Sequence, residues 1–236
     1  MDFMTKVKIK ETPNLLDGKG FVKLIDFSPR ICPDGYTPEF RIIEAARTTF
    51  DGKLKNIEQD NKLLKYLIKN NHTSPLEMVN ITFLLKLPKA CAIHFLRHRT
   101  GKFNEFSQRY SSVDENDFYC PSKCIDSFRI QSKNNKQSSY RVERDDTVVT
   151  IMENIEKKIY EIEEMYKQLI EMNFAKEVAR FYLPMSQYTK LLMCFDLNNF
   201  MKMIKLRTSG DTQYETKIYA ESMLKIAKQV FPTVLS

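Results

Sequence analysis

Several features that would place the chain in a special class are missing from its sequence. The 236 residues include no tryptophan, only six glycines, and no apolar run of about 18 residues that could span a bilayer. The first residues, MDFMTKVKIKETPN, lack the apolar stretch of a signal peptide. These absences argue against a membrane-spanning or exported protein, and we expect a soluble, cytoplasmic one.

The cysteines are also not spaced as disulfide pairs or as a zinc site would require. The five cysteines are an odd number spread over positions 32, 91, 120, 124 and 194, which disfavours a disulfide framework. Cys120 and Cys124 supply two ligands where structural zinc needs four. His94 and His98 have the spacing of a zinc helix but lack the glutamate of the HExxH motif. We therefore expect reduced thiols and no metal site.

The charge balance is moderately basic. Lysine and arginine number 37 against 30 aspartates and glutamates, a formal net charge of +7 in an otherwise ordinary globular composition. Such an excess favours an anionic partner but does not distinguish a nucleic acid from a small phosphate. The positions of the arginines must decide between them.

Hydrophobic periodicity and turn residues divide the chain into alternating strands and helices. Strands are predicted at 21–27, 78–87, near Phe118 and at 188–195, and helices at 39–50, 57–69, 89–99, 147–172, 175–182, 197–208 and 211–230. Residues 72–77 and 102–110 are predicted to be a turn and a loop. No repeat or linker is visible, so we predict one α/β (α+β) domain over 1–236. The variable excursions are about 29–38 and 125–144, and we expect nothing catalytic in the second.

The densest polar cluster follows the helix predicted at 89–99. His94, Arg97 and His98 stand at i, i+3 and i+4 and share a helix face. Arg99 and, after seven intervening residues, Ser107 extend the cluster. Guanidinium groups repel one another, so burying several together requires an anionic ligand such as a phosphate or an anionic cofactor. A solvated basic helix end requires none, and charge alone leaves both interpretations open.

The order of these residues adds information. The motif RHR-x7-S stands unbroken in RHRTGKFNEFSQRY, at 97–110, and resembles the signature of flavin-dependent thymidylate synthases, the ThyX family. HTSPLE at 72–77 is similar to the family's H-x-[TS]-P-x-E segment. Glu177 and Arg180 with LP at 183–184, and LR at 206–207 with QYE at 213–215, resemble two further family segments. The similarity extends over about residues 20–232.

This resemblance implies a specific activity and assembly. The family's reaction is the reductive methylation of dUMP to dTMP, with methylene-tetrahydrofolate as carbon donor and FAD, reduced by NADPH, as hydride source. The fold implied is a single α/β domain with a mixed or antiparallel sheet packed by long helices. The implied assembly is a homotetramer with active sites at subunit interfaces, without nucleic-acid or membrane partners.

The resemblance also implies roles for individual residues. Arg207 is the catalytic candidate, because a fixed guanidinium beside uracil favours loss of the N3 proton and raises electron density at C5. The residues expected to bind dUMP are His94, Arg97, Glu105, Phe106, Ser107, Gln108, Arg109, Arg180 and Arg207. The residues expected to bind FAD are Ser74, Glu77, Arg97, His98, Arg99, Glu105, Asp196, Asn198, Lys202, Leu206 and Asp211.

Some positions depart from the family pattern. His94 stands where glutamine is frequent, Asp196 and Lys202 where asparagine is common, and Asp211 where histidine is common. A carboxylate near a flavin or its diphosphate would repel it unless a cation offsets the charge. We therefore predict that Lys202 pairs with Asp196.

Two other classes of function compete with this reading. One is a nucleic-acid-binding module with steeply salt-dependent affinity, using the basic helix end and three aromatic stacking groups, Phe103, Phe106 and Tyr110. A nucleic-acid-binding surface does not explain the carboxylate of Glu105 and gives Arg180 and Arg207 no role. The other is a catalytically silent relative, in which the departures at 196, 202 and 211 have abolished flavin binding.

Overall fold

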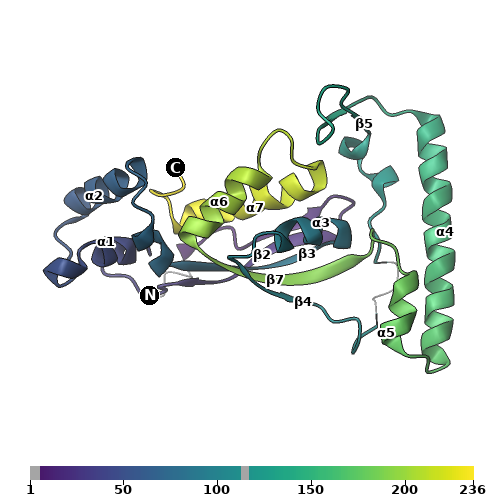
Figure 1. Cartoon of the computed structure of the whole chain (residues 1–236), viewed down its shortest axis with the longest axis horizontal. Coiled ribbons are helices and arrows are strands. Elements are labelled where there is room, and N and C mark those ends of the chain that lie inside the picture. The colour runs from purple at the N-terminus through teal and green to yellow at the C-terminus, as the bar shows by residue number, and fades with distance from the viewer. Residues whose placement is uncertain (1–5, 113–116) are drawn as a thin grey trace.

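A five-stranded antiparallel sheet forms the centre of the computed structural model, which describes residues 6–112 and 117–236 (Figure 1). The strand order is β1 (Glu11–Leu15), β2 (Gly20–Ser28), β3 (Asn80–Pro88), β7 (Tyr188–Asp196) and β4 (Lys102–Glu105). Each neighbouring pair runs antiparallel. The sheet therefore joins segments from the start, middle and end of the chain.

Alternating side chains explain how the sheet acquires its core. In β3 and β7 every second residue is buried, and the register places Phe83 opposite Met193 and Leu85 opposite Leu191. Helices α3 (Lys89–Leu96), α6 (Leu197–Arg207) and α7 (Tyr214–Val230) pack on the sheet and on one another. Phe200 of α6 stacks on Phe83 with ring centroids 6.0 Å apart. The central strands and these three helices thus share one apolar core.

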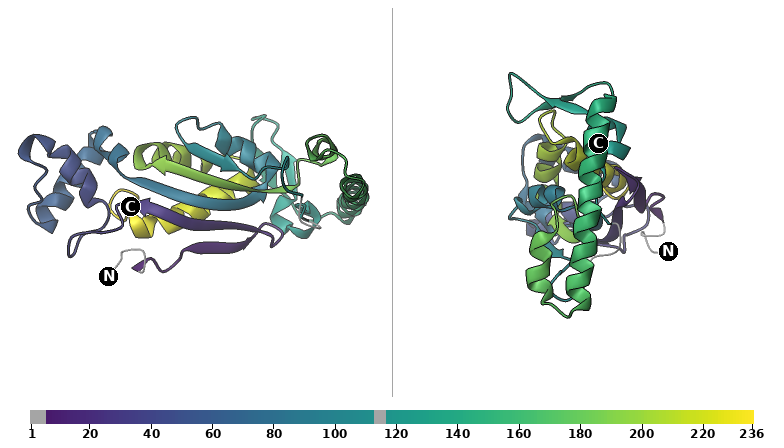
Figure 2. Two further views of the ribbon diagram at one scale, coloured as in Figure 1. Left: turned by 90° about the horizontal axis from the view of Figure 1, so that it is seen from below. Right: turned by 90° about the vertical axis from the view of Figure 1, so that its right-hand side faces the viewer.

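The two ends of the sheet carry different helices. Helices α1 (Phe40–Ala46) and α2 (Ile57–Lys69) lie at one end, and the 26-residue helix α4 (Asp146–Glu171) stands across the other (Figures 1 and 2). Beside α4 lie α5 (Lys176–Ala179) and the short 3-10 helix η6 (Arg180–Tyr182). A separate hairpin of β5 (Arg129–Gln131) and β6 (Ser139–Arg141) precedes α4.

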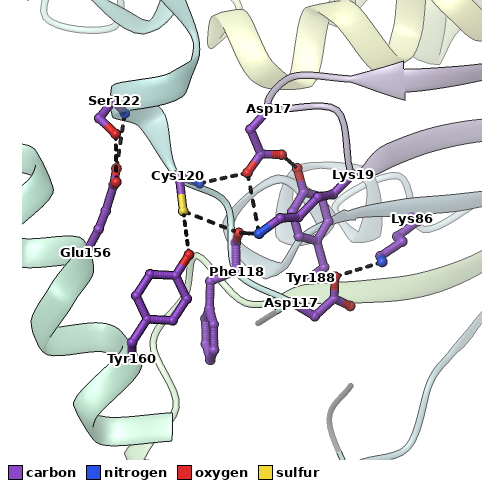
Figure 3. Close-up of polar contacts among 10 residues, drawn as sticks. All are labelled: Asp17, Lys19, Lys86, Asp117, Phe118, Cys120, Ser122, Glu156, Tyr160 and Tyr188. Atoms are coloured by element: carbon purple, nitrogen blue, oxygen red, sulfur yellow. Dashed lines mark hydrogen bonds and ion pairs between the residues drawn. The ribbon is translucent and has the colours of Figure 1, made fainter. Parts of the chain in front are cut away.

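A polar network fixes α4 to the sheet (Figure 3). The buried carboxylate of Asp17 accepts hydrogen bonds from the Tyr188 hydroxyl at 2.6 Å and from the Cys120 backbone N–H at 2.9 Å. Two residues further on, the Ser122 hydroxyl donates to Glu156 of α4 at 2.6 Å. Because buried polar groups are costly unless paired, this network holds the segment between the sheet and α4 in one position.

Most predicted elements are found, and the exceptions have local causes. The helix predicted at 39–50 ends at Ala46 and continues as the 3-10 turn Thr48–Phe50, and the one at 175–182 divides into α5 and η6. Residues 102–105, predicted as loop, form edge strand β4, which is too short for its period to be recognised. The strand near Phe118 is only a single bridge to Gln187, and β1 was not predicted. The α/β class with an antiparallel sheet is confirmed. None of the described helices is both long and apolar enough to cross a bilayer.

Candidate active site

Helices α3 and α6 bring the predicted catalytic residue against two predicted histidines. Arg207 ends α6, and its Nε donates to Nε2 of His98 at 3.0 Å while its Nη2 donates to the backbone carbonyl of His94 at 2.7 Å. His94 occupies the last turn of α3, and His98 follows just beyond it. Nη1 of Arg207 forms no hydrogen bond with any residue in the ranges 6–112 and 117–236. The guanidinium is therefore fixed on one side and free to bind a ligand on the other.

The hydrogen bond from Arg207 to His98 requires a neutral imidazole at His98. Burial, and secondarily the Arg207 charge, lowers the pKa of His98 from 6.5 to about 4, and the same causes lower the pKa of His94. Burial also lowers the pKa of Arg207. Nε2 of His98 can accept the Arg207 hydrogen bond only when it carries no proton. At neutral pH this histidine therefore positions the arginine and is not a cation itself.

A pocket of about 490 Å³ opens beside Arg207. Its lining residues come from α3, the end of α6, the loop after α6 and the β5–β6 hairpin: His94, Gln137, Leu206, Arg207, Ser209, Asp211, Thr212 and Gln213. The volume lies within the range usual for small-molecule sites. Four of the lining residues, His94, Leu206, Arg207 and Asp211, were predicted to bind dUMP or FAD. The fold thus gathers residues of both predicted groups around one cavity.

The loop after α6 is held in place by its own hydroxyl groups. Both Ser209 and Thr212 donate to the Leu206 carbonyl, at 2.9 and 2.8 Å. These bonds satisfy a carbonyl that the end of the helix leaves without a backbone partner. The pocket wall formed by this loop is consequently ordered before any ligand binds.

The start of α6 gathers further residues predicted for FAD. Asn198, which is buried, donates from its side-chain amide to Glu77 at 2.9 Å. Asp196 caps the helix by accepting from the Asn199 backbone N–H at 2.9 Å and from the Asn199 amide at 2.7 Å. The carboxylate is thus stabilised by hydrogen-bond donors and by the positive end of the helix dipole.

The predicted pairing of Asp196 with Lys202 is wrong. Lys202 is exposed and forms no ion pair with Asp196, whose two oxygens are occupied by Asn199. Six residues correspond to about 1.7 helical turns, so Lys202 projects from a different face of α6. Capping requirements of the helix, rather than a distant cation, determine the surroundings of this carboxylate.

A second group of predicted residues lies near the first residue of α3. Glu105 accepts a hydrogen bond from the Thr189 hydroxyl at 2.9 Å. The buried amide of Gln108 contacts both the Lys89 ammonium and the amide of Gln187. Burial lowers the pKa of Lys89, while Glu105 raises it and Arg180 lowers it. Glu105, Gln108 and Arg180 therefore all lie close to Lys89.

The remaining predicted residues are more exposed. Arg109 pairs with Glu177 at 3.5 Å on the surface, and its backbone N–H donates to the Ser107 hydroxyl at 3.4 Å. The other solvent-exposed members are Ser74, Phe106, Arg97, Arg99 and Lys202. In the described part of the chain no carboxylate pairs with Arg97, Arg99 or Lys202.

Three polar residues near these groups were not predicted from the sequence. Lys89 and Gln187 escaped notice because neither belongs to a recognised motif. Their segments meet through the pairing of β3 with β7 and through the bond from the Lys89 N–H to the Gln187 carbonyl, at 2.9 Å. Gln137 lies in the 125–144 excursion, where nothing catalytic was expected, yet it lines the pocket beside Arg207. Its position follows from the hairpin's tertiary packing, which no local pattern shows.

Together, fold and site describe an α/β protein with a pocket of ligand size beside a fixed arginine, and comparisons with known proteins specify the class. The family model described as "Thymidylate synthase complementing protein" matches residues 34–233. A flavin-dependent thymidylate synthase of Wolbachia pipientis wMel is 37% identical over 213 residues, which are 90% of this chain and 71% of that protein. One from Dictyostelium discoideum is 34% identical, with 90% and 69% covered.

A solved structure agrees with these sequence relatives. The UMP/dUMP methylase PolB from Streptomyces cacaoi, bound with 5-Br dUMP, superposes with a TM-score of 0.76 at 26% identity, covering 92% of this chain and 93% of that one. The chain belongs to the flavin-dependent thymidylate synthase family, as the RHR-x7-S motif predicted.

Proposed function

We propose that the chain converts dUMP to dTMP, taking the one-carbon unit from methylene-tetrahydrofolate and the hydride from FAD reduced by NADPH. Membership of a family of flavin-dependent thymidylate synthases supports both the flavin and the product. The methylase with a similar fold is bound with a dUMP analogue, which supports the substrate. The observation that carries the proposal is Arg207, held by His98 and the His94 carbonyl at the edge of a pocket of ligand size.

The chemistry of the donor set fits FAD. Its diphosphate carries negative charge, and Arg97, Arg99 and Lys202 offer exposed cations without an ion-pair partner among the described residues. The Glu77–Asn198 pair and the Leu206–Asp211 loop supply polar and apolar groups for the rest of the cofactor. Asp196 does not oppose this fit, because its carboxylate is stabilised by donors and the helix dipole at the start of α6. When bound and reduced, FAD supplies the hydride that completes the methyl group.

The residues of the chain then bind and polarise the pyrimidine. We propose that the free side of the Arg207 guanidinium faces the uracil ring and favours loss of its N3 proton, which raises electron density at C5. C5 can then attack the one-carbon unit. His98 and the His94 carbonyl keep the guanidinium in place throughout, so little reorganisation is needed.

The division of the site supports the predicted homotetramer. Lys89 and the Glu105 group lie at the first residue of α3, whereas His94 and the Arg207 pocket lie at its last turn, roughly 8 Å further along the helix axis. We propose that Glu105, Ser107, Gln108, Arg109 and Arg180 complete the pocket of a neighbouring copy. A stripe of exposed apolar side chains on α4, Val148, Ile151 and Ile155, supplies a surface for such contacts.

One assay tests the proposed function. Purified protein is incubated with dUMP, methylene-tetrahydrofolate, NADPH and FAD, dTMP is measured, and Arg207→Ala is run in parallel. We expect product that depends on FAD and is lost in the variant. Bound flavin without product would overturn the proposed activity. Absence of flavin binding would indicate the catalytically silent relative, and salt-dependent oligonucleotide binding in addition would favour the nucleic-acid alternative.

A further inference from the structure

The tip of the β5–β6 hairpin, residues 132–138, forms part of the wall of the Arg207 pocket. Asn135 donates from its side-chain amide to Asp211 at 2.9 Å, which connects the tip to the loop after α6. Gln137 lines the same pocket as His94 and Arg207. An excursion without a family motif therefore reaches the centre of the proposed active site.

This tip is built as an ordered structure. The Gln131 amide donates to the backbone carbonyls of Lys136 and Ser138 at 2.9 and 2.8 Å. The Asn135 side-chain oxygen accepts from the Gln137 backbone N–H at 2.9 Å. Asn135 thus fixes the hairpin to the loop after α6, through Asp211, and also fixes the backbone of Gln137. Such side-chain to backbone bonds fix loops that have no ladder of their own.

The Gln137 side-chain amide differs from most other polar groups of the pocket in its hydrogen bonding. The hydroxyls of Ser209 and Thr212 are engaged with the Leu206 carbonyl, and the Gln213 amide donates to Glu215 at 3.0 Å. Arg207 can only donate hydrogen bonds. The side-chain amide of Gln137 forms no hydrogen bond with the residues that the structure describes, and it offers a donor and an acceptor together.

We propose that Gln137 binds the cyclic imide of the planar ring that occupies this pocket, and that Asn135 positions it. A cyclic imide has one N–H between two carbonyls, and a primary amide can accept from the N–H while donating to a neighbouring carbonyl. Uracil and the isoalloxazine ring of a flavin both carry this group. The inference deepens the proposed function and depends on it.

Binding measurements on intact protein test this role. Gln137→Met keeps the length of the side chain and removes both hydrogen-bonding atoms, and Lys136→Ala, a neighbour that does not line the pocket, is the matched control. FAD affinity is measured by flavin fluorescence, and dUMP affinity by calorimetry on FAD-loaded protein. We expect Gln137→Met to weaken one of the two ligands about tenfold, the effect of two neutral hydrogen bonds. The weakened ligand identifies the ring, and the control stays within about twofold of wild type.

The positioning role has its own readout. Asn135→Asp keeps the acceptor for the Gln137 N–H but places a carboxylate against Asp211, so we expect the same ligand to bind more weakly. Combining Asn135→Asp with Gln137→Met should weaken binding little beyond Gln137→Met alone, because Asn135 acts through Gln137. Losses that add in the double variant would show that Asn135 has a merely structural role.

The outcomes distinguish failure of the Gln137 role from failure of the proposed function. Unchanged affinity of Gln137→Met for both ligands, in protein whose wild type binds them, overturns the role of Gln137 and leaves the proposed function intact. Wild-type protein that binds neither FAD nor dUMP overturns the proposed function and this inference with it.

Discussion

Replacing Arg207 by lysine keeps the positive charge at the proposed site but removes the forked geometry that fixes it. The guanidinium donates through two different nitrogens, to His98 at 3.0 Å and to the His94 carbonyl at 2.7 Å, and keeps Nη1 for the ligand. A lysine ammonium ends in a single nitrogen on a flexible stem and cannot preserve this arrangement. The substitution therefore separates the contribution of charge from that of position.

The expected size of the effect follows from these contacts. Losing one hydrogen bond from a charged donor to the substrate costs about 1.5–3 kcal/mol, which is roughly a 10- to 150-fold loss. The loss of a fixed orientation adds to this, so we expect kcat/KM for dUMP to fall about 10²- to 10³-fold, as when one preorganised donor is removed from an active site.

Steady-state kinetics at saturating folate and NADPH measure the effect, with FAD affinity recorded alongside. We expect FAD to bind Arg207→Lys within about threefold of wild type, since this residue is assigned to the pyrimidine. Lys205→Ala, at an exposed position two residues before Arg207 on the same helix, is the control and stays close to wild type. An Arg207→Lys enzyme within tenfold of wild type in kcat/KM would refute the argument from geometry.

Three further predictions concern stability. The pKa of His98 is about 4 in the folded protein and near 6.5 in the unfolded chain, so the unfolded state binds more protons between these pH values. The stability that the neutral histidine contributes is therefore full above about pH 6.5 and falls toward pH 4. His98→Gln should flatten this part of a pH series of urea midpoints, and an unchanged slope would contradict the argument. Asp196→Ala removes the acceptor for the Asn199 N–H and should cost about 1 kcal/mol in urea unfolding, whereas no loss would mean that the cap is not needed. Tyr219→Phe removes the 2.7 Å bond from a buried hydroxyl to the Lys86 carbonyl and should cost about 1–3 kcal/mol, seen as a lower Tm. An unchanged Tm would show that this hydrogen bond contributes nothing to stability.

Long periodic segments were the part of the fold most readily predicted. The pattern at 57–69 matches helix α2, and 188–195 and 197–208 differ from β7 and α6 by one residue at an end. Their apolar spacing is sustained over enough residues to identify the period. β4 and β1 were missed because four or five half-exposed residues carry too little pattern, and their pairing partners lie far away in the sequence.

Only part of the candidate site could likewise be predicted from the sequence. The motif order alone identified the family and singled out Arg207, and the comparisons confirm that family. Whether Arg207 meets His98 depends on how α6 packs beside α3, across 109 positions of sequence. Asp196 shows where an argument from charge alone fails, because its hydrogen-bond donors come from the helix it caps and not from Lys202, six residues further on.

By itself the sequence determined which chemistry-bearing residues are present, their order, and the family to which they belong, since these depend only on residue type and spacing. Only the tertiary structure decided which of them meet, because contacts between distant segments arise from packing of the shared core. It placed Arg207 on a neutral histidine, separated the Glu105 group from the Arg207 pocket by the length of α3, and brought Gln137 into that pocket.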